Sequence, residues 1–152
     1  MTEKMRRARK AMKEALLSII KDENRIITDQ IDPQYLSDNL GRKKGTAEAV
    51  VFPVSTEEVS GVMHYAWENN LPVTPRGAGT NLVGSTVPSG HGIVLDVSLM
   101  NHVLELDEET FTATVEPGVV LEDFQAYVES KGLFYPPDPG EKKATIGGNI
   151  ST

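Results

Sequence analysis

Apolar residues recur every three or four positions over residues 3–21, near the start of the chain. They form one stripe, which contains Met5, Ala8, Met12, Ala15, Leu16, Ile19 and Ile20. Positions three and four apart share one face of a helix, so the pattern predicts an amphipathic helix. The stripe must pack on an apolar surface, and a part of the protein outside these 152 residues is one candidate. The polar residues 22–47 show no such period and are expected to be irregular.

Short apolar runs then alternate with a longer amphipathic segment. The runs predict strands at 49–52 and 71–74, and the segment between them predicts a helix over 56–70. Ser55 and Glu58 form a capping box, which marks the start of that helix and stabilises it by about 1 kcal/mol. The result is a strand–helix–strand unit, and parallel units of this kind usually bind ligands where their strands end.

The second half of the chain predicts one further strand, a hairpin and a helix. The strand is expected at 92–97, and the hairpin strands at 103–106 and 111–115, on either side of an acidic turn. A helix is expected over 119–130, with Gly132 closing it. Together these elements indicate the α+β class, as a small mixed sheet flanked by helices that includes an α/β subdomain.

Small and polar residues fill the segment 75–85, which reads PRGAGTNLVGS. Glycine tolerates positive φ and has no Cβ, so several consecutive backbone N–H groups of such a loop can turn toward one anion. Each charge-assisted bond from an amide to a phosphate is worth about 1.5–3 kcal/mol. The segment therefore predicts a cradle for a diphosphate.

Two common nucleotide-binding motifs do not fit this segment. Gly79 and Gly84 have the spacing of a Walker loop, but Ser85 stands where that loop needs its lysine. A Rossmann turn needs a third glycine where Leu82 stands, and it opens into a helix that residues 86–92 cannot form.

Three stretches in this order resemble the flavin-binding domain of the vanillyl-alcohol oxidase / p-cresol methylhydroxylase superfamily, in particular its branch of glycolate oxidases and D-lactate dehydrogenases. These stretches are 49–59, 75–84, and 135–139 with 145–149. The resemblance implies that residues 1–45 are a helical lead segment. It implies that residues 46–152 are the first part of a PCMH-type FAD-binding domain, whose second subdomain and cap domain are absent.

The resemblance also implies a non-covalent FAD, because members that attach the flavin covalently at this loop use a histidine, which Thr80 and its neighbours do not supply. The contacts it implies in the first loop, with the last two on the ribityl side, are Arg76, Gly77, Ala78, Gly79, Thr80, Asn81, Gly84 and Ser85. The contacts it implies in the later stretches are Pro137, Asp138, Thr145, Gly147, Gly148, Asn149 and Ser151. Residues 145–151 are expected to be a second glycine-rich loop of the same kind.

Several of these segments have a simpler interpretation. Arg76 could instead pair with a carboxylate on the surface of the domain. Residues 135–140 could be a stiff connector, and residues 145–151 a flexible tail. The basic residues of the first helix could contact a membrane or an acidic partner, or only form a solvated face.

Composition limits the remaining classes of function. The chain has 39% hydrophobic residues, a net charge of −7 and no cysteine, which argues against a nucleic-acid surface and excludes disulfides, a thiolate nucleophile and Cys-ligated metals. No apolar run reaches the roughly 18 residues of a transmembrane segment, and no secretion signal is evident, so a cytoplasmic location is expected. The spacing of His64, His91 and His102 gives no metal site.

The resemblance implies an FAD-dependent oxidoreductase that oxidises a small 2-hydroxy acid such as glycolate or D-lactate. It would pass electrons to an acceptor such as an electron-transfer flavoprotein or an iron–sulfur subunit. The catalytic base and substrate-binding groups of that family come from parts absent from this sequence, so we assign no catalytic residue and expect no turnover from these residues alone. One alternative is a stand-alone FAD- or nucleotide-binding module completed by a partner chain. Another is a folding unit without ligand affinity.

Overall fold

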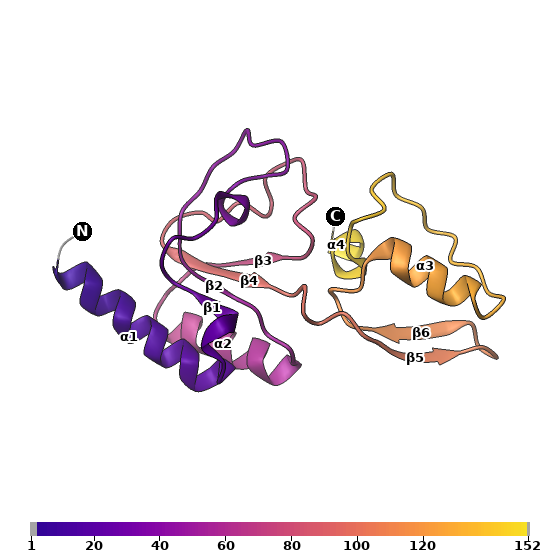
Figure 1. Cartoon of the computed structure of the whole chain (residues 1–152), viewed down its shortest axis with the longest axis horizontal. Coiled ribbons are helices and arrows are strands. Elements are labelled where there is room, and N and C mark those ends of the chain that lie inside the picture. The colour runs from indigo at the N-terminus through magenta and orange to yellow at the C-terminus, as the bar shows by residue number, and fades with distance from the viewer. Residues whose placement is uncertain (1–2, 152) are drawn as a thin grey trace.

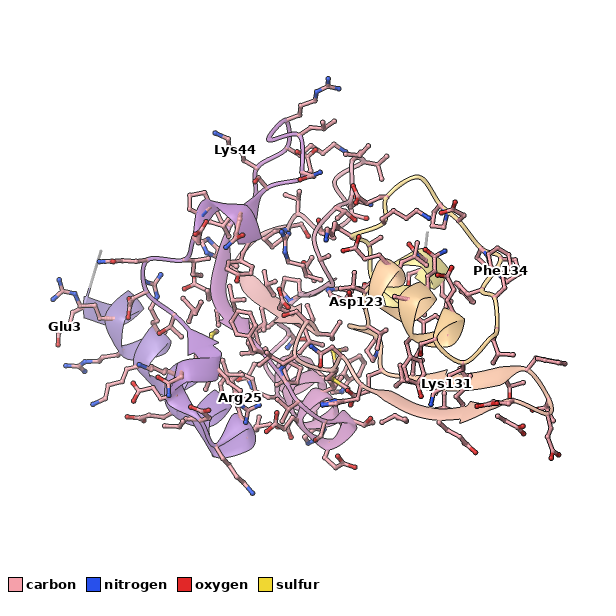
Figure 2. The ribbon with its side chains drawn as sticks, turned by 45° about the vertical axis from the view of Figure 1, so that its right-hand side comes forward. Glu3, Arg25, Lys44, Asp123, Lys131 and Phe134 are labelled. Carbon is pink, nitrogen blue, oxygen red and sulfur yellow. The ribbon has the colours of Figure 1, made fainter. Side chains whose placement is uncertain are left out.

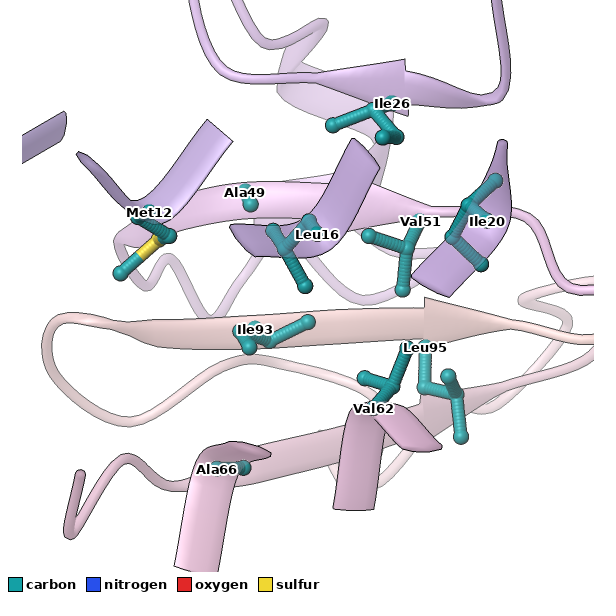
Figure 3. Close-up of a cluster of buried hydrophobic side chains, with 10 residues drawn as sticks. All are labelled: Met12, Leu16, Ile20, Ile26, Ala49, Val51, Val62, Ala66, Ile93 and Leu95. Atoms are coloured by element: carbon teal, nitrogen blue, oxygen red, sulfur yellow. The ribbon is translucent and has the colours of Figure 1, made fainter. Parts of the chain in front are cut away.

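The computed structural model describes residues 3–151, apart from the side chains of Lys4 and Met5; the predicted stripe position Met5 therefore lies outside the described side chains. Its first element is the predicted helix, α1 (Glu3–Ile20). Met12, Leu16 and Ile20 of α1 are buried in one apolar cluster with residues of the sheet (Figure 3). The part of the stripe from Met12 to Ile20 thus packs within this chain, whereas Ala8 is exposed.

A four-stranded sheet forms the centre of the first half. Its strands are β1 (Ile26–Ile27), β2 (Ala47–Val51), β3 (Val73–Arg76) and β4 (Gly92–Asp96), in the spatial order β1-β2-β4-β3. β2, β4 and β3 are parallel, and β1 pairs antiparallel with β2. The strands predicted at 49–52 and 92–97 are confirmed. The strand predicted at 71–74 lies at 73–76, so Pro75 and Arg76 belong to β3 and not to the loop. The expectation of an irregular stretch over 22–47 is wrong at β1. Short 3-10 helices, η1 (Glu23–Arg25) and η2 (Pro33–Leu36), lie on either side of β1 in the sequence.

The helix α2 (Thr56–Glu68) connects β2 to β3 and packs beside α1 against the sheet (Figure 1). It starts at the predicted cap, because Ser55 Oγ accepts the N–H of Glu58 at 3.2 Å. The Glu58 carboxylate does not return to Ser55 and instead accepts the N–H of Val54 at 2.9 Å. The two helices approach closely at Gly61, where an added Cβ would lie 2.7 Å from Ile19 Cγ2.

The second half of the chain lies beside the sheet (Figure 1) and has its own apolar cluster. The hairpin β5 (Val103–Asp107) and β6 (Thr112–Val115) is confirmed, and so is the helix α3 (Leu121–Glu129). The expectation of an open glycine loop at 145–151 is wrong, because Ile146–Ser151 form a short helix, α4. Thr145 Oγ1 accepts the N–H of Gly148 at 3.2 Å and so caps the turn in place of an open loop.

No helix within residues 3–151 has the length and apolar character needed to cross a membrane.

Arg25 joins α1 to the start of α2 (Figure 2). Its Nη1 and Nη2 donate to the two carboxylate oxygens of Glu58 at 2.5 and 2.8 Å, and both side chains are only 16% exposed. The same guanidinium also donates to the carbonyls of Ile20 and Phe52. The hydrogen bond from Arg25 is the main cause that lowers the pKa of Glu58.

We expect Glu58→Gln to lower the free energy of unfolding by about 2–3 kcal/mol at pH 7, because a partly buried Arg25 loses its bidentate partner. A lowered native pKa means that the carboxylate stabilises the fold above its ordinary pKa of 4.5. The difference between wild type and variant should therefore shrink as the pH falls through the lower native value. Urea unfolding at several pH values measures this. Glu57→Gln, at the exposed neighbouring position, should change stability little; equal loss in both variants would contradict the assignment.

Candidate functional site

The loop that follows β3, residues 77–81, presents a row of backbone donors. None of the five amide N–H groups of this amide loop donates a hydrogen bond to another residue in the part of the chain that the structure describes. Gly79 has a φ of +72°, which favours glycine. The loop lies at the carboxyl end of a parallel strand, where ligands of α/β units commonly bind. Its free amides are suited to an anion.

The structure brings two of the predicted stretches together at Gly77 and Thr145. A Cβ on Gly77 would collide with the hydroxyl of Thr145, which is buried at the start of α4. A backbone bridge between Val120 and Thr145 fixes the position of that threonine against the second half of the chain. In Figure 1 the carboxyl end of β3 accordingly faces α4. The amide loop therefore lies at the junction of the two halves.

The amide groups of Gly84 and Ser85 are not free. Asn81 Oδ1 accepts three N–H groups, those of Val83, Gly84 and Ser85, at 3.0, 2.8 and 3.0 Å. Among the described hydrogen bonds, the predicted loop thus divides into open amides from Gly77 to Leu82 and the closed amides of residues 83–85. A contact from Ser85 to a ligand would use its exposed hydroxyl.

Arg76 is buried beneath the amide loop, with 8% of its surface exposed. Its Nε lies 4.0 Å from Asp96 Oδ2, and its guanidinium carbon lies 5.5 Å from the centre of the Tyr35 ring. Arg76 pairs with a carboxylate, as its simpler interpretation predicts, but the pair is buried and not on the surface. Burial lowers the pKa of Arg76 and raises that of Asp96. Nη1 is buried without a hydrogen-bond partner in the described chain.

The remaining predicted positions lie between α3 and α4 or within α4. Pro137 and Asp138 are exposed on the connection between these helices, where Asp138 pairs with Lys142 and the carbonyl of Pro137 accepts from Gln125. No hydrogen bond or ion pair among the described residues joins this connection to the amide loop.

Within α4 the backbone donors are already used. The N–H groups of Gly147 and Asn149 donate to the carbonyls of Pro117 and Thr145, and that of Gly148 donates to the Thr145 hydroxyl. The hydroxyl of Ser151 donates to the carbonyl of Gly147 at 2.7 Å. This segment therefore offers side chains to a ligand, but not a second row of amides.

Sequence reasoning missed Tyr35 and Asp96. Tyr35 belongs to η2, in the stretch expected to be irregular, and Asp96 ends β4 directly opposite Arg76 in the parallel pairing. The available signal was a charged residue at the end of each of two apolar strand runs, since the ends of neighbouring parallel strands lie together.

A family model for the FAD binding domain matches residues 47–152. The chain is 44% identical over 143 residues to glycolate oxidase subunit GlcD from Bacillus subtilis (strain 168), covering 93% of this chain and 30% of that protein. It is 42% identical over 128 residues to D-lactate dehydrogenase from Anaerostipes hadrus, covering 84% of this chain and 27% of that protein. The chain thus spans less than a third of the length of these curated relatives.

Solved structures have the same fold. p-Cresol methylhydroxylase with bound substrate superposes with a TM-score of 0.79 over 98% of this chain and 30% of its own, at 22% identity. 4-Ethylphenol oxidase from Gulosibacter chungangensis superposes with a TM-score of 0.76 over 93% of this chain and 28% of its own, at 25% identity. The family match and the shared fold confirm the resemblance, and the chain belongs to the FAD binding domain family, with FAD as its cofactor.

Proposed function

We propose that the amide loop binds the pyrophosphate of FAD without a covalent bond. The observation that carries the proposal is the row of five N–H groups at residues 77–81, which have no acceptor among the described residues. Backbone donors on a turn suit an anion that carries several oxygens. Gly77 and Gly79 keep side-chain atoms out of two positions in that row, and no histidine lies between Pro75 and Gly90 to attach a flavin.

The whole protein is proposed to be an oxidoreductase that acts on a small 2-hydroxy acid such as glycolate or D-lactate. The support is the identity to glycolate oxidase subunit GlcD and to D-lactate dehydrogenase. FAD supplies the redox chemistry when bound, and the protein supplies binding, orientation and electrostatics.

In this proposal, the residues that the structure describes bind the cofactor. The amides of residues 77–81 bind phosphate oxygens, and Thr145 closes the side of the loop at Gly77. Thr80, Pro137, Asp138, Asn149 and Ser151 remain proposed contacts through side-chain or carbonyl atoms. We assign none of these residues to catalysis, and we propose that substrate-binding groups come from the part of the relatives' length that this chain does not span. An electron-transfer flavoprotein or an iron–sulfur subunit is the proposed electron acceptor.

Ala78 offers the sharpest test because its side chain is exposed in the middle of the amide loop. In the product of the complete reading frame, Ala78→Glu should raise the Kd for FAD about tenfold relative to Ala78→Gln, since a carboxylate beside the amides repels the pyrophosphate. Fluorescence titration of the apoprotein measures both. Equal affinities would place the pyrophosphate elsewhere. A valine at Gly79 is a poorer test, because its Cβ would collide with Arg76 whether or not FAD binds there.

Asn81 should matter through its side-chain carbonyl. Asn81→Ala removes the acceptor of three N–H groups, so the amides of Val83, Gly84 and Ser85 should exchange with deuterium at least tenfold faster. Asn81→Asp keeps an acceptor oxygen and should retain most of the protection. Hydrogen-exchange NMR resolves the three amides, and unchanged rates in the alanine variant would contradict this assignment.

A further inference from the structure

The segment 35–43 contacts the amide loop and the residues on either side of it at three separate points. This segment precedes residue 47, where the match to the family model begins. The ring of Tyr35 lies against the guanidinium of Arg76, directly before the amide loop. The N–H of Asn39 donates to the carbonyl of Asn81 at 3.1 Å, at the end of the amide loop. Lys43 Nζ donates to the carbonyl of Val83 at 2.8 Å. In Figure 1 this segment and the chain after β3 lie side by side above the sheet.

We propose that the segment 35–43 holds the amide loop in its FAD-binding shape, and that Tyr35 and Arg76 are positioning residues for the cofactor. The inference rests on the proposed pyrophosphate site and adds to it a contribution from the lead segment.

Arg76 acts through the loop and not by touching the anion. Its guanidinium is enclosed, with Asp96 and Tyr35 beside it. Gly79 lies so close that a Cβ there would collide with Nη2 and with the guanidinium carbon. The planar group therefore fills the space beneath the turn and limits how closely the backbone at Gly79 can approach the interior of the domain.

Hydrogen bonds contribute little to holding this guanidinium. The nearest carboxylate oxygen is 4.0 Å from Nε, and Nη1 has no partner among the described atoms. The shape of the group, its charge attraction to Asp96 and its contact with the Tyr35 ring are what remain to hold it. A lysine has the same charge but lacks the planar guanidinium that packs beneath Gly79 and against the Tyr35 ring, so it cannot replace Arg76 here.

The distances also assign separate tasks within the segment 35–43. Tyr35 contacts the start of the loop from below through Arg76, whereas Asn39 and Lys43 bind its end through two carbonyls. A Cβ on Gly84 would collide with Lys43 Cδ, so the lysine side chain passes directly beside the backbone that follows the loop. Between these two attachments the five amides have no other internal restraint among the described hydrogen bonds.

The test uses paired variants of the product of the complete reading frame. Tyr35→Phe keeps the aromatic face and should leave the Kd for FAD unchanged, whereas Tyr35→Leu should raise it about fivefold. Arg76→Lys should raise the Kd at least tenfold. At saturating FAD, the 31P resonances of the bound pyrophosphate should move in Tyr35→Leu and Arg76→Lys but not in Tyr35→Phe, a change that a general loss of stability does not produce.

Wild-type affinity and 31P shifts in both Tyr35→Leu and Arg76→Lys would overturn the inference. If Arg76→Lys does not fold, the Tyr35 pair decides the question alone, because equal binding by its leucine and phenylalanine forms contradicts the proposal. Comparison of Ala78→Glu with Ala78→Gln separates failure of the proposed pyrophosphate site from failure of the role of the segment 35–43. If Ala78→Glu raises the Kd for FAD as expected and Tyr35→Leu does not, only the role of the segment 35–43 is contradicted. No response in the Ala78 pair removes the pyrophosphate site and this inference with it.

Discussion

An open turn of five amide groups has no hydrogen bonds of its own to maintain its shape. The shape must come from what surrounds it, and here the surroundings are two close approaches. Thr145 approaches Gly77 from the second half of the chain, and the Arg76 guanidinium approaches Gly79 from the interior. Both approaches need glycine. Gly77 leaves space for the Thr145 hydroxyl, and Gly79 leaves space for the guanidinium and also has a positive φ. The glycines therefore serve the packing of the protein around the loop, in addition to the proposed access of a phosphate to it.

The two halves of the chain depend on each other at this point. The sheet half contributes β3, the loop and the buried Arg76, and the hairpin half contributes Thr145 at the start of α4. Each half has its own apolar cluster. Their junction is the place where a cofactor contact can combine backbone donors from one half with side chains from the other, which agrees with the use of this fold for FAD.

Local periodicity was sufficient to predict α1, α2, α3 and the hairpin, because each has a clear period and a recognisable start or turn. β1 was missed because two residues are too few to show alternation. α4 was missed because Gly147 and Gly148 have low helix propensity, and a cap from Thr145 and a contact with Pro117 determine its shape. Tyr35 and Asp96 meet Arg76 only after the strands pair and η2 packs, which is tertiary information that no local pattern carries.

The strand order has a consequence for how the protein assembles. β3 pairs only with β4 in the described sheet, and β4 comes later in the chain and enters between β2 and β3. The amide loop lies in the connection between β3 and β4, and β3 has no partner in the described sheet until β4 pairs with it. The pairing of β2 with β4 joins segments farther apart in the sequence than the pairing of β3 with β4 does, and closing a longer connection costs more chain entropy. The completed β3–β4 pair, and with it the proposed FAD cradle, therefore requires the chain as far as Asp96.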